Sequence, residues 1–414
     1  MKIFKLLLLL FALLFPLTAC AQLLAEQTVA RPAVYVQYHV WFRIADKCPA
    51  SSATTTWYHW AWWSESNNPC NFVGGTSWLR DYSGPTYPLI GPYKSNNPEI
   101  FRWHIRLAKA AGIDGFLVST FPGGGDGGSE FMANFLIFLK VAYEENFKLG
   151  LEGWQPLGTN ADFYTNFKKH FDQAASSQYA AALATINNKP IMWFVFWSRW
   201  DTISNLTSNL LNAREAFWVI GGDLSISELN SINLTNGAEK TQLVPYGYPS
   251  ASGCAFHAIA VSDGLNDMRS NGYVAGSHGF PGFNEVMMSH DPGRNPPRYC
   301  LRNNGQTIDN FFQESSKGSA DYVFLESWND FDEYTEFEPG LDVIAWRNVG
   351  QEAIYNGDPY AQLKLIANFK GAAFVAPTLD CTIVDPVLRQ QGVVQCGTTP
   401  PPSPPNAPSG LAIN

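Results

Sequence analysis

Eight short apolar or aromatic runs, separated by helical patterns, constrain the fold of this chain more than any other feature. The expected strands are residues 34–42, 115–120, 148–154, 190–197, 217–223, 243–249, 273–279 and 322–328. Helical patterns fall between them, for instance at 98–113 and 162–186. Near-continuous apolar strands that alternate with helices are typical of an α/β fold with a covered parallel sheet. Eight such repeats predict a (β/α)8 TIM barrel. A doubly wound open sheet is the alternative, but no glycine-rich nucleotide motif follows any strand.

The N-terminus has the form of an export signal. Lys2 and Lys5 precede an apolar run at 6–17 that is too short to span a bilayer. Residues 17–20, LTAC, resemble the lipobox of bacterial lipoproteins, whose cysteine is lipidated and becomes the mature N-terminus. We therefore expect a signal peptide at 1–20, lipidation at Cys20 and a spacer at 21–32. The expected location is the outer membrane or cell surface, with a secreted or periplasmic protein as the alternative.

The C-terminus changes composition abruptly. Residues 398–408 are rich in Pro, Ser and Thr, which is typical of an extended spacer. The following residues, 409–414, resemble the opening of a fibronectin type III module, and an unstructured tail is the alternative. The sequence therefore predicts one large domain at 33–397, a Pro-rich linker and the start of a further module.

Cysteine usage fits an oxidising compartment, because six cysteines follow Cys20 and form an even set. Pairing each cysteine with its nearest neighbour predicts the disulfides Cys48–Cys70, Cys254–Cys300 and Cys381–Cys396. No CxxC motif occurs, and the histidines do not cluster with the cysteines at zinc-ligand spacing. We therefore expect neither a metal nor a cofactor.

The net charge of the chain is -9, which argues against a nucleic acid partner, since proteins that bind phosphate backbones carry basic faces. The aromatic content of 14% includes 14 Trp, an unusually high number. We expect a monomer whose partner is a polysaccharide and whose contact with the membrane is the lipid anchor alone.

In a barrel, the side chains just beyond each strand gather around one pocket. The expected substrate contacts are Tyr38, His39, Glu152, Trp154, Trp197, Tyr246, His278, Asn284, Glu285, Trp328 and Asn329. Trp60, from the Trp-rich insertion after the first strand, would extend this lining. Aromatic faces and carboxylates together suit sugars, although packing in the core is the alternative for each Trp. For Glu152 and Glu285 the alternative is an ion pair with Arg199 or Arg294, and Glu326 is expected to be structural.

Residues 321–340, DYVFLESWNDFDEYTEFEPG, contain seven carboxylates and no basic side chain. Asp330 and Glu333 follow the eighth strand, and in a helical turn their i,i+3 spacing would place them on one face. Two neighbouring carboxylates, one protonated and one ionised, are what glycoside hydrolysis requires. The alternative is that these acids cap a helix and accept backbone hydrogen bonds.

The segment WNDFDEYTEFEP resembles the WNEWxEGTxIEP signature of glycoside hydrolase family 99, the endo-α-mannosidases and endo-α-mannanases. Its ND pair is closer to the WNDxGES motif of family 71, the α-1,3-glucanases. Further segments follow in the order expected of family 99, namely YVQYHVWF, WYHWAWW, GPYKSNNPEIFRWHIRLAKAAGIDGFLVS and PGFNE, so the resemblance spans most of 33–340.

Carried over to this sequence, the resemblance implies that Glu333 is the general acid/base and Asp330 the second catalytic carboxylate. Asp330 stands where family 99 has Glu, and Tyr334 stands where both motifs have a small residue. Assistance by the 2-hydroxyl of the substrate, as in family 99, and activation of water with inversion, as in family 71, both remain open.

Together these observations predict an exported glycoside hydrolase that cleaves within an α-linked polysaccharide. A surface carbohydrate-binding protein without turnover is the alternative, and a structural surface module would need neither acid. Mannan, α-glucan and a fucose-containing polymer all fit this prediction.

Overall fold

The computed structural model describes residues 31–45, 57–61, 67–120, 127–153, 169–186, 188–194, 217–220, 241–250, 252–256, 260–285, 296–343 and 352–397. Cys20, Cys48, Trp154, Trp197, most of the spacer and the C-terminal linker lie outside these residues. Among the described helices, none combines the length and the apolar character needed to cross a membrane.

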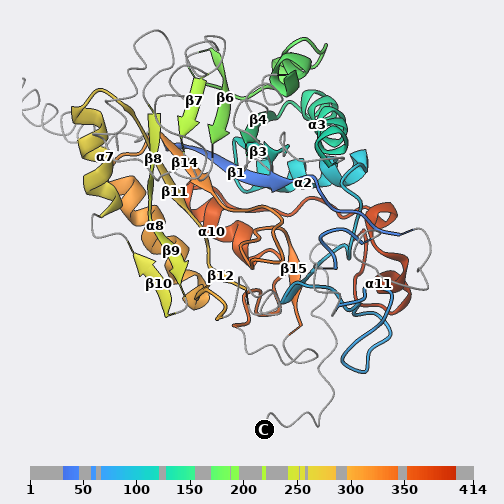
Figure 1. Cartoon of the computed structure of the whole chain (residues 1–414). Helices are drawn as coiled ribbons and strands as arrows, with labels where there is room; N and C mark the ends of the chain where they lie inside the picture. Colours follow the sequence, from blue (N-terminus) through green and yellow to red (C-terminus); the bar gives the residue numbers. More distant parts are fainter. Residues whose placement is uncertain are drawn as a thin grey trace, which may run out of the picture. The chain divides into compact units, whose positions relative to one another are not determined.

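A parallel sheet forms the centre of the fold (Figure 1). Its strands are β1 (Ala33–His39), β3 (Gly115–Ser119), β4 (Lys148–Gly153), β6 (Lys189–Phe194), β7 (Phe217–Ile220), β8 (Thr241–Pro245), β11 (Val274–Gly279) and β14 (Tyr322–Leu325). They pair in the order β4-β3-β1-β14-β11-β8-β7-β6, and β6 also pairs with β4. Each strand overlaps one of the eight predicted from sequence, so the prediction of an α/β fold with a parallel sheet is confirmed.

Helices cover the sheet, and one of them illustrates how the sequence marks a helix start. The helices are α2 (Pro98–Ala110), α3 (Gly127–Glu144), α7 (Val261–Ser270), α8 (Gln306–Lys317), α10 (Ala361–Phe369) and α11 (Pro386–Gln390), with short 3-10 turns η1 (Ala180–Ala182), η5 (Asn303–Gly305) and η6 (Cys381–Ile383). At the start of α2, the Asn97 side chain accepts a hydrogen bond from the Glu99 N–H, and Pro98 occupies the first helical position. The helix predicted at 98–113 is thereby confirmed.

The helix predicted at 162–186 is wrong in its second half. There the chain forms η1 and then β5 (Thr185–Ile186), which pairs antiparallel with β6. Asn188, between β5 and β6, has φ +63°, a left-handed conformation that asparagine tolerates in tight turns. Pairing with the sheet therefore overrides the helical propensity of an alanine-rich segment.

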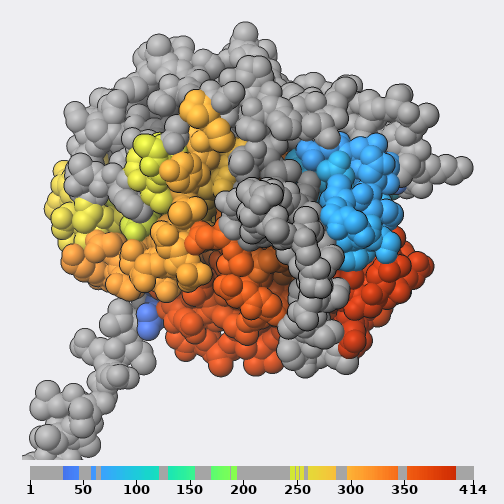
Figure 2. Space-filling model, turned by 90° about the horizontal axis from the view of Figure 1, so that it is seen from below, coloured from blue at the N-terminus to red at the C-terminus, as the bar shows by residue number. Residues whose placement is uncertain are grey.

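Two smaller sheets flank the central one. One has the order β10 (Gly253–Phe256), β9 (Gly247–Ser250), β13 (Tyr299–Cys300) and β12 (Phe283–Asn284), and the other pairs β15 (Gly340–Asp342) with β2 (Thr86–Pro88). Arg80 Nε lies 3.0 Å from Asp385 Oδ2, which joins the insertion after β1 to the C-terminal segment. Figure 2 shows these segments in blue and red, side by side on one face.

The disulfides Cys254–Cys300 and Cys381–Cys396 are both present, as predicted. The first ties β10 to β13, and the second closes the C-terminal segment around α11. Cys70 is also disulfide-bonded.

Apolar side chains that share one face of the parallel strands pack together. This cluster contains Tyr35, Leu117, Ile191, Trp193, Leu243 and Phe324. Because side chains alternate along a strand, residues two positions further on point to the same side. Gln37 and His39 continue the row of Tyr35, Ser119 continues that of Leu117, and Glu326 continues that of Phe324. The row is thus apolar at its base and polar at the C-terminal edge of the sheet.

Candidate active site

The loop after β14 is fastened to the end of β1. Asn329 Oδ1 accepts a hydrogen bond from the His39 N–H at 2.8 Å, and its Nδ2 donates to the His39 carbonyl at 2.9 Å. The Trp328 N–H donates to the Gln37 carbonyl at 2.6 Å. Trp328 and Asn329 are fully buried, and the Trp328 ring packs on Phe116. These two residues therefore hold the acidic loop against the sheet.

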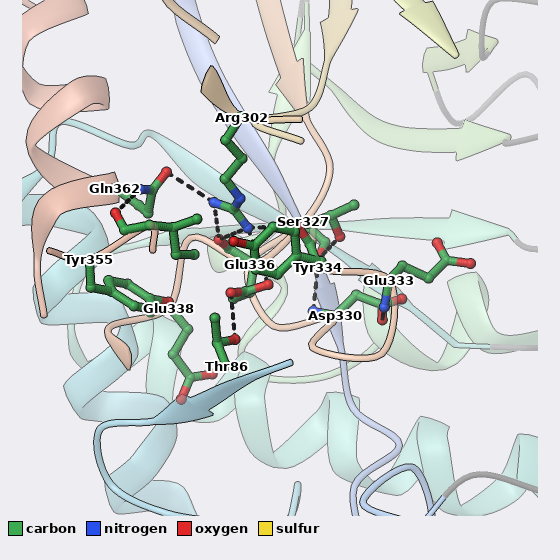
Figure 3. Close-up of polar contacts among 12 residues, drawn as sticks. Thr86, Arg302, Ser327, Asp330, Glu333, Tyr334, Glu336, Glu338, Tyr355 and Gln362 are labelled. Atoms are coloured by element: carbon green, nitrogen blue, oxygen red, sulfur yellow. Dashed lines mark hydrogen bonds and ion pairs between the residues drawn. The ribbon is translucent and has the colours of Figure 1, made fainter. Parts of the chain in front are cut away.

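Asp330 and Glu333 lie together in this loop. Asp330 Oδ1 accepts a hydrogen bond from the Glu333 N–H at 3.1 Å, so the side chain of the first acid closes the turn that presents the second. Asp330 is 6% exposed, whereas Glu333 is partly exposed. Figure 3 shows the Glu333 side chain directed away from the buried group of Glu336 and Arg302. The segment forms a turn directly after β14, which places both residues at the C-terminal edge of the sheet.

Tyr334 occupies the position in this turn where the two family motifs have a small residue. Its φ is +61°, a left-handed conformation in which glycine is the least strained residue. Here the tyrosine ring lies under the Arg302 guanidinium, with 4.6 Å from the Arg302 Cζ to the ring centroid. Its hydroxyl donates to the Glu352 carbonyl at 2.7 Å. Packing and hydrogen bonding therefore hold a bulky residue in the conformation that the turn requires.

Glu152 lies at the end of β4, completely buried. Gln37 Nε2 donates to its Oε1 at 2.6 Å, and the Ser119 hydroxyl bonds to its Oε2 at 2.8 Å. Burial raises the pKa of Glu152 well above its usual value, and the charge of Glu326 raises it further. This environment therefore favours the protonated form of the side chain.

Glu326 and His278 form a more open pair on the neighbouring strands β14 and β11. His278 Nε2 lies 3.4 Å from Glu326 Oε1, and the two side chains are 15% and 21% exposed. The Trp193 ring meets the His278 ring edge to face at 5.5 Å between centroids. Glu326, expected to be structural, thus lies beside a predicted substrate contact at the same edge. The sequence contains a signal for this position, because Glu326 is two residues after Phe324 and therefore points to the same side of the sheet. Gln37, two residues after Tyr35, carries the same signal.

A buried polar network lies beside the turn that carries Asp330 and Glu333 (Figure 3). Arg302 Nη2 lies 3.2 Å from Glu336 Oε2, and the Thr86 hydroxyl donates to Glu336 Oε1 at 2.7 Å. The Tyr93 hydroxyl donates to Glu338 Oε2 at 2.6 Å and accepts from Asn329 Nδ2 at 3.0 Å. All of these carboxyl and guanidinium groups are buried, and their contacts with one another offset part of the cost of removing them from water.

Comparison with known proteins places this arrangement in context. No family model matches the sequence, and no curated protein matches it. Among solved structures, the family 99 (GH99) endo-α-mannosidase from Bacteroides thetaiotaomicron superposes with a TM-score of 0.57 at 18% identity, covering 82% of this chain and 96% of that one. A glycoside hydrolase-like protein superposes with a TM-score of 0.50 at 14% identity, covering 81% and 94%. The chain has the family 99 fold. The resemblance to family 99 inferred from the sequence is therefore confirmed for the fold.

On this family 99 fold, Glu285 is fully buried and bound by Arg298. Arg298 Nε donates to Glu285 Oε2 at 2.9 Å, and Arg298 Nη2 donates to Oε1. The ion-pair alternative for Glu285 therefore holds with Arg298, while Arg199 and Arg294 lie outside the described residues. The neighbouring Asn284 donates its N–H to the Glu333 carbonyl at 2.8 Å and so braces the turn that carries Glu333.

Three further aromatic contacts predicted from sequence lie at different depths. Tyr38 is buried, and its hydroxyl bonds to His104 Nδ1 at 2.8 Å. Trp60 is also buried, and its indole N–H donates to the Tyr93 carbonyl. Tyr246 is partly exposed beside Phe311, and its N–H donates to the His278 carbonyl. Of the three, Tyr246 alone is partly exposed, and its ring lies against α8.

The protonation of Glu152 leads to a testable stability difference. Because the folded pKa is raised, the folded state binds this proton more tightly than the unfolded chain does. Stability therefore falls as pH rises above the unfolded pKa, by up to about 1.4 kcal/mol per pH unit. Glu152→Gln resembles the neutral acid and can keep both hydrogen bonds. We expect the stability of this variant relative to wild type to increase between about pH 5 and pH 8 in urea unfolding. A pH-independent difference would contradict a neutral Glu152.

Proposed function

We propose that this chain is an exported glycoside hydrolase, with a (β/α)8 barrel, that cleaves within an α-linked polysaccharide. The observation that carries the proposal is the Asp330 and Glu333 pair, presented at the C-terminal edge of a parallel sheet in a chain with the family 99 fold. The return of the strand pairing from β6 to β4 supports the barrel. The neighbouring polar pair, His278 and Glu326, suits the hydroxyls of sugars.

In this mechanism Glu333 is the general acid. Its side chain is the more exposed of the two and can reach the glycosidic oxygen, to which it gives a proton as the C–O bond breaks. Asp330, shielded and fixed by the Glu333 N–H, accepts a proton from the attacking water, whose oxygen bonds to the anomeric carbon. This inverting route matches the shorter Asp at position 330, since water needs space between carboxylate and sugar.

Release of reducing ends from a panel of neutral α-mannans and α-glucans tests the proposal. We expect oligosaccharides of several lengths early in the reaction, because an endo-acting enzyme cuts inside the chain. NMR of the first product distinguishes an inverted from a retained anomer. Binding to a polysaccharide in an affinity gel without any release of reducing ends would instead favour the carbohydrate-binding alternative.

Export and lipidation are part of the same proposal. The signal-like residues 1–20 and the two disulfides support export. Attachment of lipid at Cys20 stays a prediction from the sequence.

A further inference from the structure

Three aromatic rings are stacked next to Asp330. The centroids of His39 and Trp41 are 3.7 Å apart with planes at 6°, and those of Trp41 and His59 are 3.9 Å apart with planes at 8°. His39 and Trp41 are 1% and 5% exposed, and the His59 side chain is 10% exposed. An indole held between two imidazoles at these distances fixes the planes of all three rings.

Each end of this stack faces an aspartate of the same turn. His39 Nε2 lies 3.6 Å from Asp330 Oδ2, and His59 Nδ1 lies 3.5 Å from Asp332 Oδ2. The Ser83 hydroxyl donates to Asp332 Oδ1, and Asp332 is 3% exposed. Asp332 is thus a buried acid, held by two partners, that the proposed reaction does not use.

We propose that Asp332 is a positioning residue for Asp330 and acts through the stacked rings of His59, Trp41 and His39. The inference rests on the proposed function, because it concerns the carboxylate assigned there as the base. By holding His59, Asp332 fixes one end of the stack, and the stack then fixes the His39 ring beside Asp330.

The charged groups around the stack affect the pKa values of the two histidines differently. The charged groups that face His39 are Asp330 and, across Trp41, His59, whereas those that face His59 are Asp332 and Arg43. Burial lowers the pKa of His39 well below its usual value, and the charge of His59 lowers it further. Burial also lowers the pKa of His59, but Asp332 opposes that shift. Asp332 therefore favours a proton on His59 over one on His39, the histidine beside Asp330.

Asp332→Asn tests this role, because it keeps the shape of the side chain and an acceptor for Ser83 but removes the charge. We expect kcat to fall about 10-fold near neutral pH with little change in KM. We also expect the acid limb of the pH profile to move to higher pH, since His39 now takes the first proton. His59→Gln should move the limb in the same direction. A uniform loss of kcat with an unmoved limb would show that Asp332 is merely structural.

A second readout does not depend on turnover. In protein with isotope-labelled histidine, NMR titration should show a higher pKa for His39 in Asp332→Asn than in wild type. Asp380→Asn is the matched control, because it removes the same charge from an exposed cap of η6 and should leave His39 unchanged. If wild type cleaves no polysaccharide but the His39 pKa is still higher in Asp332→Asn, the proposed function is refuted. The coupling between Asp332 and His39 then still holds. An unshifted His39 would overturn the coupling whether or not the protein is active.

Discussion

Turnover of the natural polysaccharide is expected to fall about 100-fold or more in Glu333→Gln, because the amide cannot protonate the leaving oxygen. The substitution keeps the size of the side chain, and the Glu333 backbone still bonds to Asn284 and to Asp330. Binding of the polysaccharide should therefore survive. Initial rates of reducing-end release, with affinity measured separately, check both expectations. Glu99→Gln, an exposed acid at the start of α2, is the control for loss of one carboxylate.

An activated substrate separates the roles of the two acids. A good leaving group needs little protonation, so Glu333→Gln should recover much of its rate on an aryl glycoside. Asp330→Asn should stay inactive on both substrates, because a better leaving group does not replace the base. Near-native rates for both variants on the polysaccharide would contradict the assignment. Glu326 and Glu152, two further acids among the described residues at this edge of the sheet, would then be the next to test.

Much of the fold could be predicted because its signals are local. A buried parallel strand reads as an apolar run, and α2 is marked by its cap and by Pro98, so these elements could be placed from neighbouring residues alone. The second half of 162–186 failed because pairing of β5 with β6 is a tertiary contact, which local propensity does not report.

In the candidate site, too, the local features could be predicted and the contacts between distant residues could not. Asp330 and Glu333 could be placed because they directly follow the last strand of a repeating pattern, and such residues meet at one edge of the sheet. The ion pair of Glu336 with Arg302 joins residues far apart in sequence, and so does the stack of His39 with His59. No spacing rule relates these residues. The i,i+3 spacing does not reveal that Asp330 accepts the Glu333 N–H, so this contact within the turn was not predicted.

Arg302→Met is expected to lower the free energy of unfolding by about 3–5 kcal/mol, because it leaves the carboxylate of Glu336 buried without its cation. Arg302 also donates hydrogen bonds to the carbonyls of Tyr334 and Glu336 and to Gln362 Oε1. Burial raises the pKa of Glu336 to about 7 even with Arg302 present. The folded state therefore holds this proton more tightly than the unfolded chain, and loss of the arginine raises the pKa further. The cost of the substitution should accordingly be smaller at about pH 5 than at about pH 8.

Arg302→Met with Glu336→Gln separates the buried charge from the lost packing. The double variant removes both ionic groups and keeps an acceptor for the Thr86 hydroxyl, so urea unfolding should show it to be more stable than Arg302→Met alone. Its activity should remain low, because the carbonyls of Tyr334 and Glu336 still lack the guanidinium that holds the turn carrying Glu333. Full recovery of both stability and turnover would mean that the turn keeps its shape without Arg302. A loss below about 1 kcal/mol in the single variant would contradict a buried, charge-compensated Glu336.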